Sequence, residues 1–189
     1  YPLGHINTAV FWQRLTDGDI HFTLSESGWA KCSWGKMYGQ WLAGATVFVF
    51  DFSHIFTAHD LLGAIADNKV TSFCAPPTAY KMMINANMDK FDLSSLVKAD
   101  VAGEALNPEV YERFLEKTGV KLHEGFGQTE TTVLLFNNEW IEPKPGSMGK
   151  PAVGWNIQLL DERGRRITDV NTVGEICVCV KDSKPLGLF

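Results

Sequence analysis

Apolar stretches alternate with helical patterns between residues 46 and 124, which predicts repeated strand–helix units. The predicted strands are the runs rich in β-branched, aromatic or other apolar residues, at 46–50, 70–74, 96–101 and 120–123. Helices are predicted between them, at 57–68, 78–88 and 107–119. This alternation favours an α/β fold, in which crossover helices join the strands of a parallel sheet with right-handed connections.

The helix predicted at 107–119 has the clearest boundaries. Asn107 can cap its N-terminus, Pro108 suits its first turn and Gly119 can end it. Both ends of this helix are therefore predicted from local chemistry alone.

Period-two alternation predicts further strands outside the central region. In 19–25, Ile20, Phe22 and Leu24 share one face. Toward the C-terminus, strands are predicted at 155–160 and 174–180 on either side of a turn, which indicates a small antiparallel β unit. We therefore predict an α/β part at residues 1–142 and a β-rich segment at 143–189.

Charge and hydropathy exclude several classes of partner. The chain of 189 residues has 17 basic and 22 acidic side chains, a net charge of 17 − 22 = −5, which disfavours binding to nucleic acid or an anionic membrane. The longest apolar run, 41–50, is about half of what a bilayer span needs. The first ten residues do not resemble a signal peptide. We predict a cytoplasmic protein without nucleic-acid or membrane partners; the oligomeric state is not predicted.

Cysteine and histidine usage gives no sign of a metal site. Cys177 and Cys179 lie on one face of a predicted strand, but no second close pair completes a four-ligand zinc site. We expect the 4 cysteines to be reduced thiols. The 5 histidines are scattered without ligand or triad spacing, so none receives a metal or nucleophile role.

Three unusual segments each follow a predicted strand: 74–77 (CAPP), 103–104 (GE) and 124–130 (EGFGQTE). Ligands of open parallel sheets bind outside the carboxyl ends of the strands. We therefore expect these three segments to meet at one crevice.

The segment 125–131 (GFGQTET) carries the strongest chemical signal. Its Gly-x-Gly allows backbone N–H groups to approach an anion, and Thr129 and Glu130 suit a phosphate and its Mg²⁺. The alternative is a strand-to-helix turn that needs glycine for steric reasons. It is not a Walker-type loop, because the chain contains no GxxxxGK[ST].

The other candidate segments have simpler alternatives. Gly103 and Glu104 can present backbone to an adenine edge, or can form only a loop into a capped helix. The segment 74–77 is either a substrate wall or a proline-fixed strand exit. The tryptophans at 12, 29, 34 and 41 are expected in the core, with an acyl pocket as the alternative for Trp12 and Trp34. We expect Lys31 to be a surface lysine.

The chain resembles the acyl-adenylate-forming superfamily over essentially its whole length. The segments that carry the resemblance are DGDIHFTLSESGWAK, WGKMYGQWLAGA, CAPPTAY, AGEALNPEV, HEGFGQTET and KPGSMGKP. The similarity is to its short- and medium-chain acyl-CoA synthetase branch. The resemblance implies a ligase that joins a small-molecule carboxylic acid to AMP from ATP and then to coenzyme A, releasing AMP.

The same resemblance implies roles for individual residues. Adenine contacts are implied for Gly103, Glu104 and Ala105. The segment that runs along the nucleotide and the acyl carbon is implied to be Glu124, Gly125, Phe126 and Gly127, with the Phe126 ring stacked near the adenine. Gln128 and Thr129 are implied to approach the α-phosphate, and Glu130 to hold Mg²⁺, so that Thr129 and Glu130 are the catalytic candidates. The acyl chain is implied to lie among Trp12, Trp34, Cys74, Gly125 and Gly127.

The resemblance also implies a phosphate loop before Tyr1 and a C-terminal lid with a catalytic lysine after Phe189, neither of which is in this sequence. We therefore expect a fragment of a longer enzyme that is inactive in isolation. Two alternatives stay open: an adenylating enzyme that loads a carrier-protein thiol, and a non-catalytic nucleotide-binding module.

Overall fold

A seven-stranded sheet forms the centre of the molecule in a computed structural model, which describes residues 1–52, 55–181 and 184–188 except for the side chain of Trp34. The strand order is β2-β1-β3-β4-β5-β6-β7. The first five strands in this order are parallel, and β6 and β7 continue the sheet antiparallel. The bounds are β1 Ile20–Thr23, β2 Thr46–Val47, β3 Ser72–Ala75, β4 Lys98–Val101, β5 Leu122–Gln128, β6 Thr132–Phe136 and β7 Lys150–Pro151.

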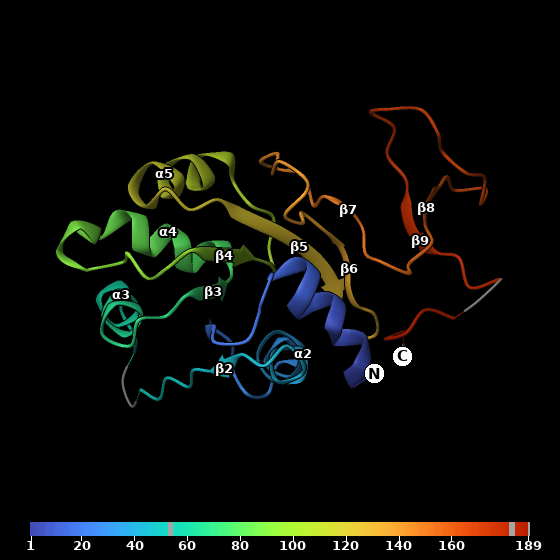
Figure 1. Ribbon diagram of the computed structural model, residues 1–189. Helices are drawn as coiled ribbons and strands as arrows, with labels where there is room; N and C mark the ends of the chain where they lie inside the picture. Colours follow the sequence, from blue (N-terminus) through green and yellow to red (C-terminus); the bar gives the residue numbers. More distant parts are fainter. Residues whose placement is uncertain (53–54, 182–183, 189) are drawn as a thin grey trace.

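Helices cover both faces of this sheet. On one face α3, α4 and α5 lie in a row with α4 in the middle, and on the other face α2 packs with the N-terminal turns (Figure 1). The bounds are α1 Ala30–Cys32, α2 Tyr38–Leu42, α3 Ala58–Asp67, α4 Pro77–Asn85 and α5 Pro108–Thr118. Short 3-10 helices span Pro2–His5 and Met88–Lys90, and π-helical turns span Asn7–Trp12 (η2) and Ser33–Met37 (η3).

Both faces of the central strands β1, β3 and β4 are buried along most of their length, as is typical of a parallel sheet covered by helices. In β3, Phe73 packs into the larger core under α3 to α5, whereas Cys74 points to a second core with Trp12 and Val133. The predicted parallel α/β architecture is therefore confirmed, with helical layers on both sides.

The predicted helix ends agree with the observed caps. Asn107 Oδ1 accepts a hydrogen bond from the backbone N–H of Glu109 at 2.9 Å. Gly119 ends α5 with a left-handed φ of 72°. In α3, the Thr57 side chain accepts from Asp60 N–H, and the Asp60 carboxylate accepts in return from Thr57 N–H, which forms a capping box.

Replacing Asn107 with alanine should lower the free energy of unfolding by about 1 kcal/mol, because the Glu109 N–H loses its acceptor. Urea unfolding of the parent and the variant measures the loss. Asn107→Asp is the matched control, since aspartate keeps the acceptor oxygen. An equal loss in both variants would contradict the capping role.

Several predicted boundaries are wrong. The strand predicted at 46–50 ends at Val47, although Phe48 N–H still donates to the His21 carbonyl at 2.8 Å. The rings of Phe48 and Phe50 pack against Phe22, with ring centroids 5.1 and 6.1 Å away. The helix predicted at 78–88 begins at Pro77 and ends at Asn85, followed by a separate 3-10 turn. The intervening asparagines have low helical propensity, which favours this break.

The largest difference concerns the strand predicted at 120–123. It runs as β5 from Leu122 to Gln128 and turns directly into β6, which was not among the predicted strands. The run TVLLF of β6 has the β-branched and aromatic composition of a strand. The Gly-x-Gly segment therefore lies in an antiparallel hairpin and not at a strand-to-helix turn.

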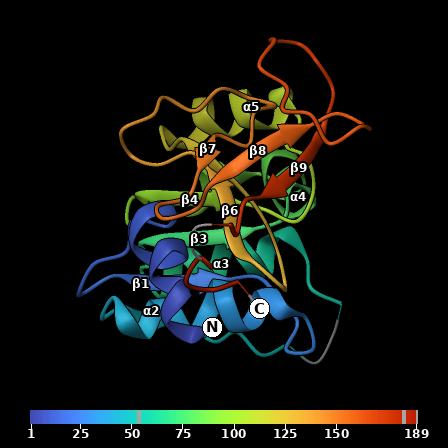
Figure 2. The same cartoon turned by 90° about the vertical axis from the view of Figure 1, so that its right-hand side faces the viewer.

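The C-terminal segment contains the predicted antiparallel unit. Strands β8 (Ile157–Leu160) and β9 (Glu175–Val178) pair with each other and form a sheet separate from the large one, as Figure 2 shows in orange and red. β7 precedes this unit and pairs with β6 of the large sheet. The division at residues 142 and 143 stays a prediction. Within the described residues, no helix is long and apolar enough to cross a membrane.

Candidate active site

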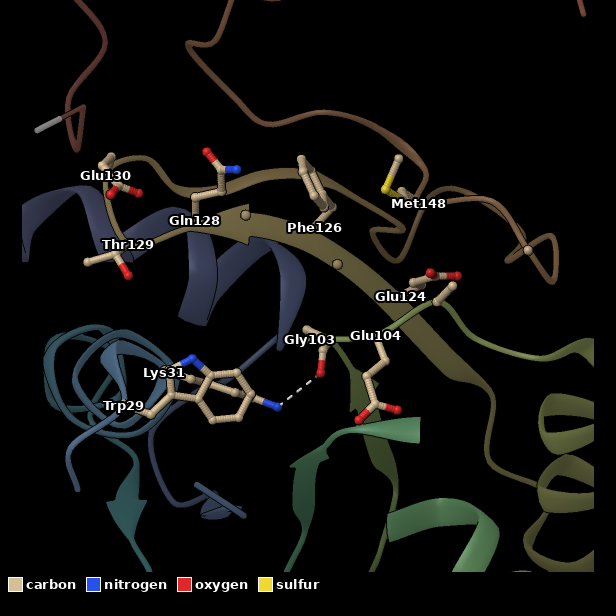
Figure 3. A pocket seen from close by; sticks show the side chains of 15 residues that line it. Trp29, Lys31, Gly103, Glu104, Glu124, Phe126, Gln128, Thr129, Glu130 and Met148 are labelled. Carbon is tan, nitrogen blue, oxygen red and sulfur yellow. Dashed lines mark hydrogen bonds between the residues drawn. The ribbon is translucent and has the colours of Figure 1, made fainter. Parts of the chain in front are cut away.

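A cavity of about 800 Å³ opens at the carboxyl ends of β4 and β5. In Figure 3, Phe126 and Gln128 project from β5 toward the loop that carries Met148, and Trp29 and Lys31 lie on the other side of this strand. The cavity is lined by Trp29, Lys31, Ala102, Gly103, Glu104, Ala105, Glu124, Gly125, Phe126, Gly127, Gln128, Thr129, Glu130, Gly146 and Met148.

Two of the three segments expected at one crevice line this cavity, and the third does not. Cys74 and Ala75 are fully buried in β3, and Pro77 begins α4. The segment 74–77 is thus the exit of β3 into α4, and its role as a substrate wall stays a prediction. It is linked to the cavity by the Ala75 carbonyl, which accepts from the N–H of the lining residue Ala102 at 3.4 Å, and the Thr78 hydroxyl that follows the segment donates to Glu104 Oε1 at 3.4 Å.

Close packing explains both glycines of the hairpin. A Cβ atom at Gly125 would overlap the indole of Trp12, and a Cβ atom at Gly127 would overlap the backbone carbonyl of Thr132. The ladder between β5 and β6 shifts its register at Phe126 and Gly127. Because both glycines lack side chains, β5 can lie close to Trp12 of η2 and to the backbone of β6.

The turn between β5 and β6 carries the polar end of the motif. Thr131 Oγ1 accepts from Gln128 N–H at 3.0 Å, and Thr131 N–H donates to the Gln128 carbonyl at 3.1 Å. The Tyr1 hydroxyl donates to the Thr129 carbonyl at 2.7 Å. These bonds leave the side chains of Gln128, Thr129 and Glu130 exposed at the cavity.

The end of β4 provides backbone to the same cavity. Gly103 has a φ of 102°, in the region that favours glycine. A Cβ atom there would also lie 3.0 Å from the Trp29 ring. Gly103 thus has two independent steric reasons to be glycine.

Glu124 is a nearly buried carboxyl group in the cavity wall, 5% exposed. Its Oε1 accepts from Leu106 N–H at 3.4 Å, while its Oε2 is buried without a hydrogen-bond partner. Burial raises the pKa of this carboxyl group. The second oxygen is therefore available to a donor from a ligand in the cavity.

Lys31 contradicts the expectation of a surface lysine. Its side chain is fully buried and lines the cavity, and its Nζ donates to the Ala102 carbonyl at 3.3 Å. The Nζ also lies 5.5 Å from the centre of the Trp29 ring. Burial lowers the pKa of Lys31. Trp29, expected in the core, is 45% exposed in the cavity wall.

The residues implied for the acyl chain lie beside the cavity and do not all line it. Trp12 and Cys74 are fully buried in the second core, and Trp12 Nε1 donates to the His123 carbonyl at 3.0 Å. Burial raises the pKa of the Cys74 thiol to about 11. Gly125 and Gly127 line the cavity, and the side chain of Trp34 lies outside what the structure describes.

Comparison with known proteins identifies the family. Residues 5–180 match the family of AMP-binding enzymes. The chain belongs to this family.

Related AMP-binding enzymes match the chain over its whole length. It is 40% identical to 4-hydroxybutyrate–CoA ligase 1 of Metallosphaera sedula and 38% identical to mitochondrial acyl-coenzyme A synthetase ACSM3 of Rattus norvegicus, over 189 residues in both cases. These matches cover 100% of this chain but only 33% and 32% of the relatives. The chain thus spans about a third of the length of the relatives it matches.

Solved AMP-binding structures share the fold. An acyl-CoA synthetase of Brucella canis superposes with a TM-score of 0.89 at 28% identity, over 100% of this chain and 35% of that chain. The anthranilate CoA ligase AuaEII, solved with anthranoyl-AMP, superposes with a TM-score of 0.86 at 27% identity, over 97% and 35%. The seven-stranded sheet and its helices therefore form part of a known enzyme architecture.

The acidic groups at the cavity of this AMP-binding chain do not form a self-sufficient metal site. Among the described residues, no three histidine, cysteine, aspartate or glutamate side chains are grouped so that they hold a metal ion. Glu130 is an exposed carboxylate at the cavity. Such a group fits Mg²⁺, which proteins often bind through one or two carboxylates together with substrate phosphates.

Proposed function

We propose that this chain forms the nucleotide and acyl part of the active site in an ATP-dependent acyl-CoA synthetase for short- or medium-chain acids. The observation that supports this most directly is that Gly103–Ala105 and Glu124–Glu130 line one cavity. These are the two segments expected to hold a nucleotide, in a chain of the AMP-binding enzyme family. Carboxylate attack on the α-phosphate of ATP forms acyl-AMP and pyrophosphate, and attack by the CoA thiolate then releases AMP.

In this proposal the chain contributes positioning and charge, not covalent chemistry. The exposed backbone of Gly103, Glu104 and Ala105 contacts the adenine edge, and Phe126 stacks near the ring. The orphaned Oε2 of Glu124 accepts a hydrogen bond from a nucleotide N–H group, which supplies the partner that its buried position lacks. Gln128 and Thr129 approach the α-phosphate from the hairpin turn.

The acyl chain lies between Gly125, Gly127, the buried side chains of Trp12 and Cys74, and Trp34. Because Trp12 packs directly against Gly125, the space behind β5 is small, which favours short acids. Two of the proteins named above are named as CoA ligases of 4-hydroxybutyrate and of anthranilate, and the exchange assay below identifies the acid of this protein. A cytoplasmic location stays a prediction, since ACSM3 is named as mitochondrial.

Glu130 is the residue that would hold Mg²⁺, which neutralises charge on the phosphate oxygens when bound. Replacing Glu130 with glutamine should reduce acid-dependent ATP–pyrophosphate exchange about tenfold, because the amide keeps the shape but loses the charge. The deficit should shrink as the Mg²⁺ concentration is raised, and a titration of exchange against Mg²⁺ measures this.

Glu116→Gln is the matched control, since it removes the same charge from an exposed position on α5. Equal exchange rates and equal Mg²⁺ dependence in the parent and Glu130→Gln would show that Glu130 does not have this role.

The test of the proposed function is ATP–pyrophosphate exchange by the full-length gene product, with acids of two to eight carbons. Exchange that depends on one of these acids supports an adenylating enzyme, and acyl transfer to CoA then separates a CoA ligase from an enzyme that loads a carrier protein. We expect the 189-residue chain alone to be inactive, and turnover above a no-protein control would contradict that. No exchange by the full product would favour a non-catalytic nucleotide-binding module.

A further inference from the structure

Thr132 has a backbone conformation that β-branched residues rarely adopt. Its φ is 59°, in the left-handed region, where the branched Cβ crowds the backbone. The residue is fully buried and is the first residue of β6, directly after the turn at the cavity. The backbone of Thr132 is therefore strained, and the surrounding packing must hold it in this conformation.

The side chain of Thr132 adds a second unfavourable feature. Its Oγ1 is buried without a hydrogen-bond partner. Its methyl group packs against the backbone of Gly187, where an added Cβ would lie only 2.9 Å from Thr132 Cγ2. Gly187 in turn lies against Gly4, since an added Cβ at Gly187 would lie 3.2 Å from Gly4 Cα.

The strained residue is directly coupled to the cavity. Thr132 pairs with Gln128 across the hairpin, and Val133 pairs with Gly127. The Thr132 carbonyl occupies the space that a side chain at Gly127 would need. The register shift thus begins one pair beyond the left-handed residue, between the pairs made by Val133 and Leu135. The backbone of Thr132 sets where Gly127 and the turn that follows it lie.

Strained backbone that persists in a buried place concentrates at functional sites, where it pre-organises a ligand-binding segment. We propose that Thr132 is a positioning residue, whose left-handed backbone holds Gly127, Gln128, Thr129 and Glu130 in the arrangement that receives the nucleotide phosphates. This inference rests on the proposed function, because its first test measures enzyme activity. Thr132 itself does not line the cavity and acts through the hairpin.

The test compares Thr132→Gly with Thr132→Asn in the full-length protein. Glycine accepts a positive φ but also many other conformations, so the turn should lose its fixed position and the KM for ATP should rise about tenfold. Asparagine tolerates the left-handed region, so it should keep the KM within about threefold of the parent. Asn171→Gly is the matched control, since Asn171 has a φ of 60° but is exposed and far from the cavity in sequence.

A second readout does not depend on activity. Amide hydrogen exchange over residues 127–131 should be faster in Thr132→Gly than in the parent and in Asn171→Gly, with unchanged exchange in α5. Equal protection of these amides in the parent and Thr132→Gly would overturn the proposal, whatever the activity. If the parent shows no pyrophosphate exchange, the proposed function fails and the amide result alone decides the role of Thr132. If the glycine variant does not fold, a tenfold rise of the KM for ATP in Thr132→Asn would overturn the proposed positioning role of Thr132.

Discussion

Replacing Gly127 with alanine should reduce ATP–pyrophosphate exchange by about 10²-fold or more, because displacing a positioned group by about 1 Å is enough for such a loss. The added methyl group would overlap the backbone carbonyl of Thr132, which cannot move away as a flexible side chain can. β5 and β6 must then separate or slip, and Gln128, Thr129 and Glu130 move with them. Exchange assays on the full-length protein, with the unfolding temperature of each variant, measure the effect.

Gly28→Ala is the control for this substitution. Gly28 precedes Trp29, and a Cβ atom there would meet nothing within 4 Å. It should therefore retain the parent's exchange rate and unfolding temperature. Near-parental exchange in Gly127→Ala would mean that the hairpin tolerates separation and that its close packing does not set the site geometry.

The free energy of unfolding should fall steeply as the pH is lowered from 7 to 5. Burial lowers the pKa of His5 to about 3 and the pKa values of His21 and His123 to about 4. The unfolded chain binds protons at these histidines below about pH 6.5, while the folded chain does not. Their stabilisation is therefore complete above pH 6.5 and is lost as the pH falls toward the folded values.

Asp100 changes the free energy of unfolding with pH in the opposite direction. Burial raises its pKa to about 7 despite its ion pair with Arg14 at 2.8 Å, so its contribution is present at low pH and is lost as the pH rises through 7. In this pH range the folded chain thus binds one extra proton at Asp100, which offsets about one of the three protons that the unfolded chain binds at the histidines. The net slope should be roughly 3 kcal/mol per pH unit, at about 1.4 kcal/mol for each proton.

Urea unfolding at several pH values, followed by tryptophan fluorescence, measures this slope. His21→Gln should reduce it by about 1.4 kcal/mol per pH unit, since one protonation site is removed from the unfolded chain. His21 is fully buried, with its ring nitrogens 2.9 Å from Ser72 Oγ and 2.7 Å from Thr23 Oγ1. His59→Gln, at an exposed position, is the control for the substitution itself. The same slope in His21→Gln and the parent would show that His21 does not contribute.

Local chemistry in the sequence was sufficient for the elements with strong boundary signals. Asn107 and Gly119 define α5 because caps act through bonds to neighbouring backbone groups. The parallel order of the central strands follows from strand–helix alternation, since each crossover returns the chain to the same edge of the sheet. For the same reason Gly103 and Gly127 were placed near each other, and both line the cavity.

The identity of the glycines was predictable, but the reason for them was not. Gly125 is needed because Trp12 packs against it, and these residues are 113 positions apart in the chain of 189 residues (125 − 12 = 113). Lys31 and Trp29 carried no sequence signal for the cavity, because lysine is almost never fully buried. Only the packing of α1 against the end of β4 buries the ammonium group against the Ala102 carbonyl.

The sequence by itself determined the α/β class, the capped helices and the two segments that line the cavity, because periodicity and caps are local properties of the chain. The tertiary structure decided which groups meet those segments: Lys31 and Trp29 in the cavity wall, Trp12 behind Gly125, and the carbonyl of the strained Thr132 against Gly127. These contacts depend on close packing between elements far apart in sequence, and no local pattern encodes the distance between two backbones.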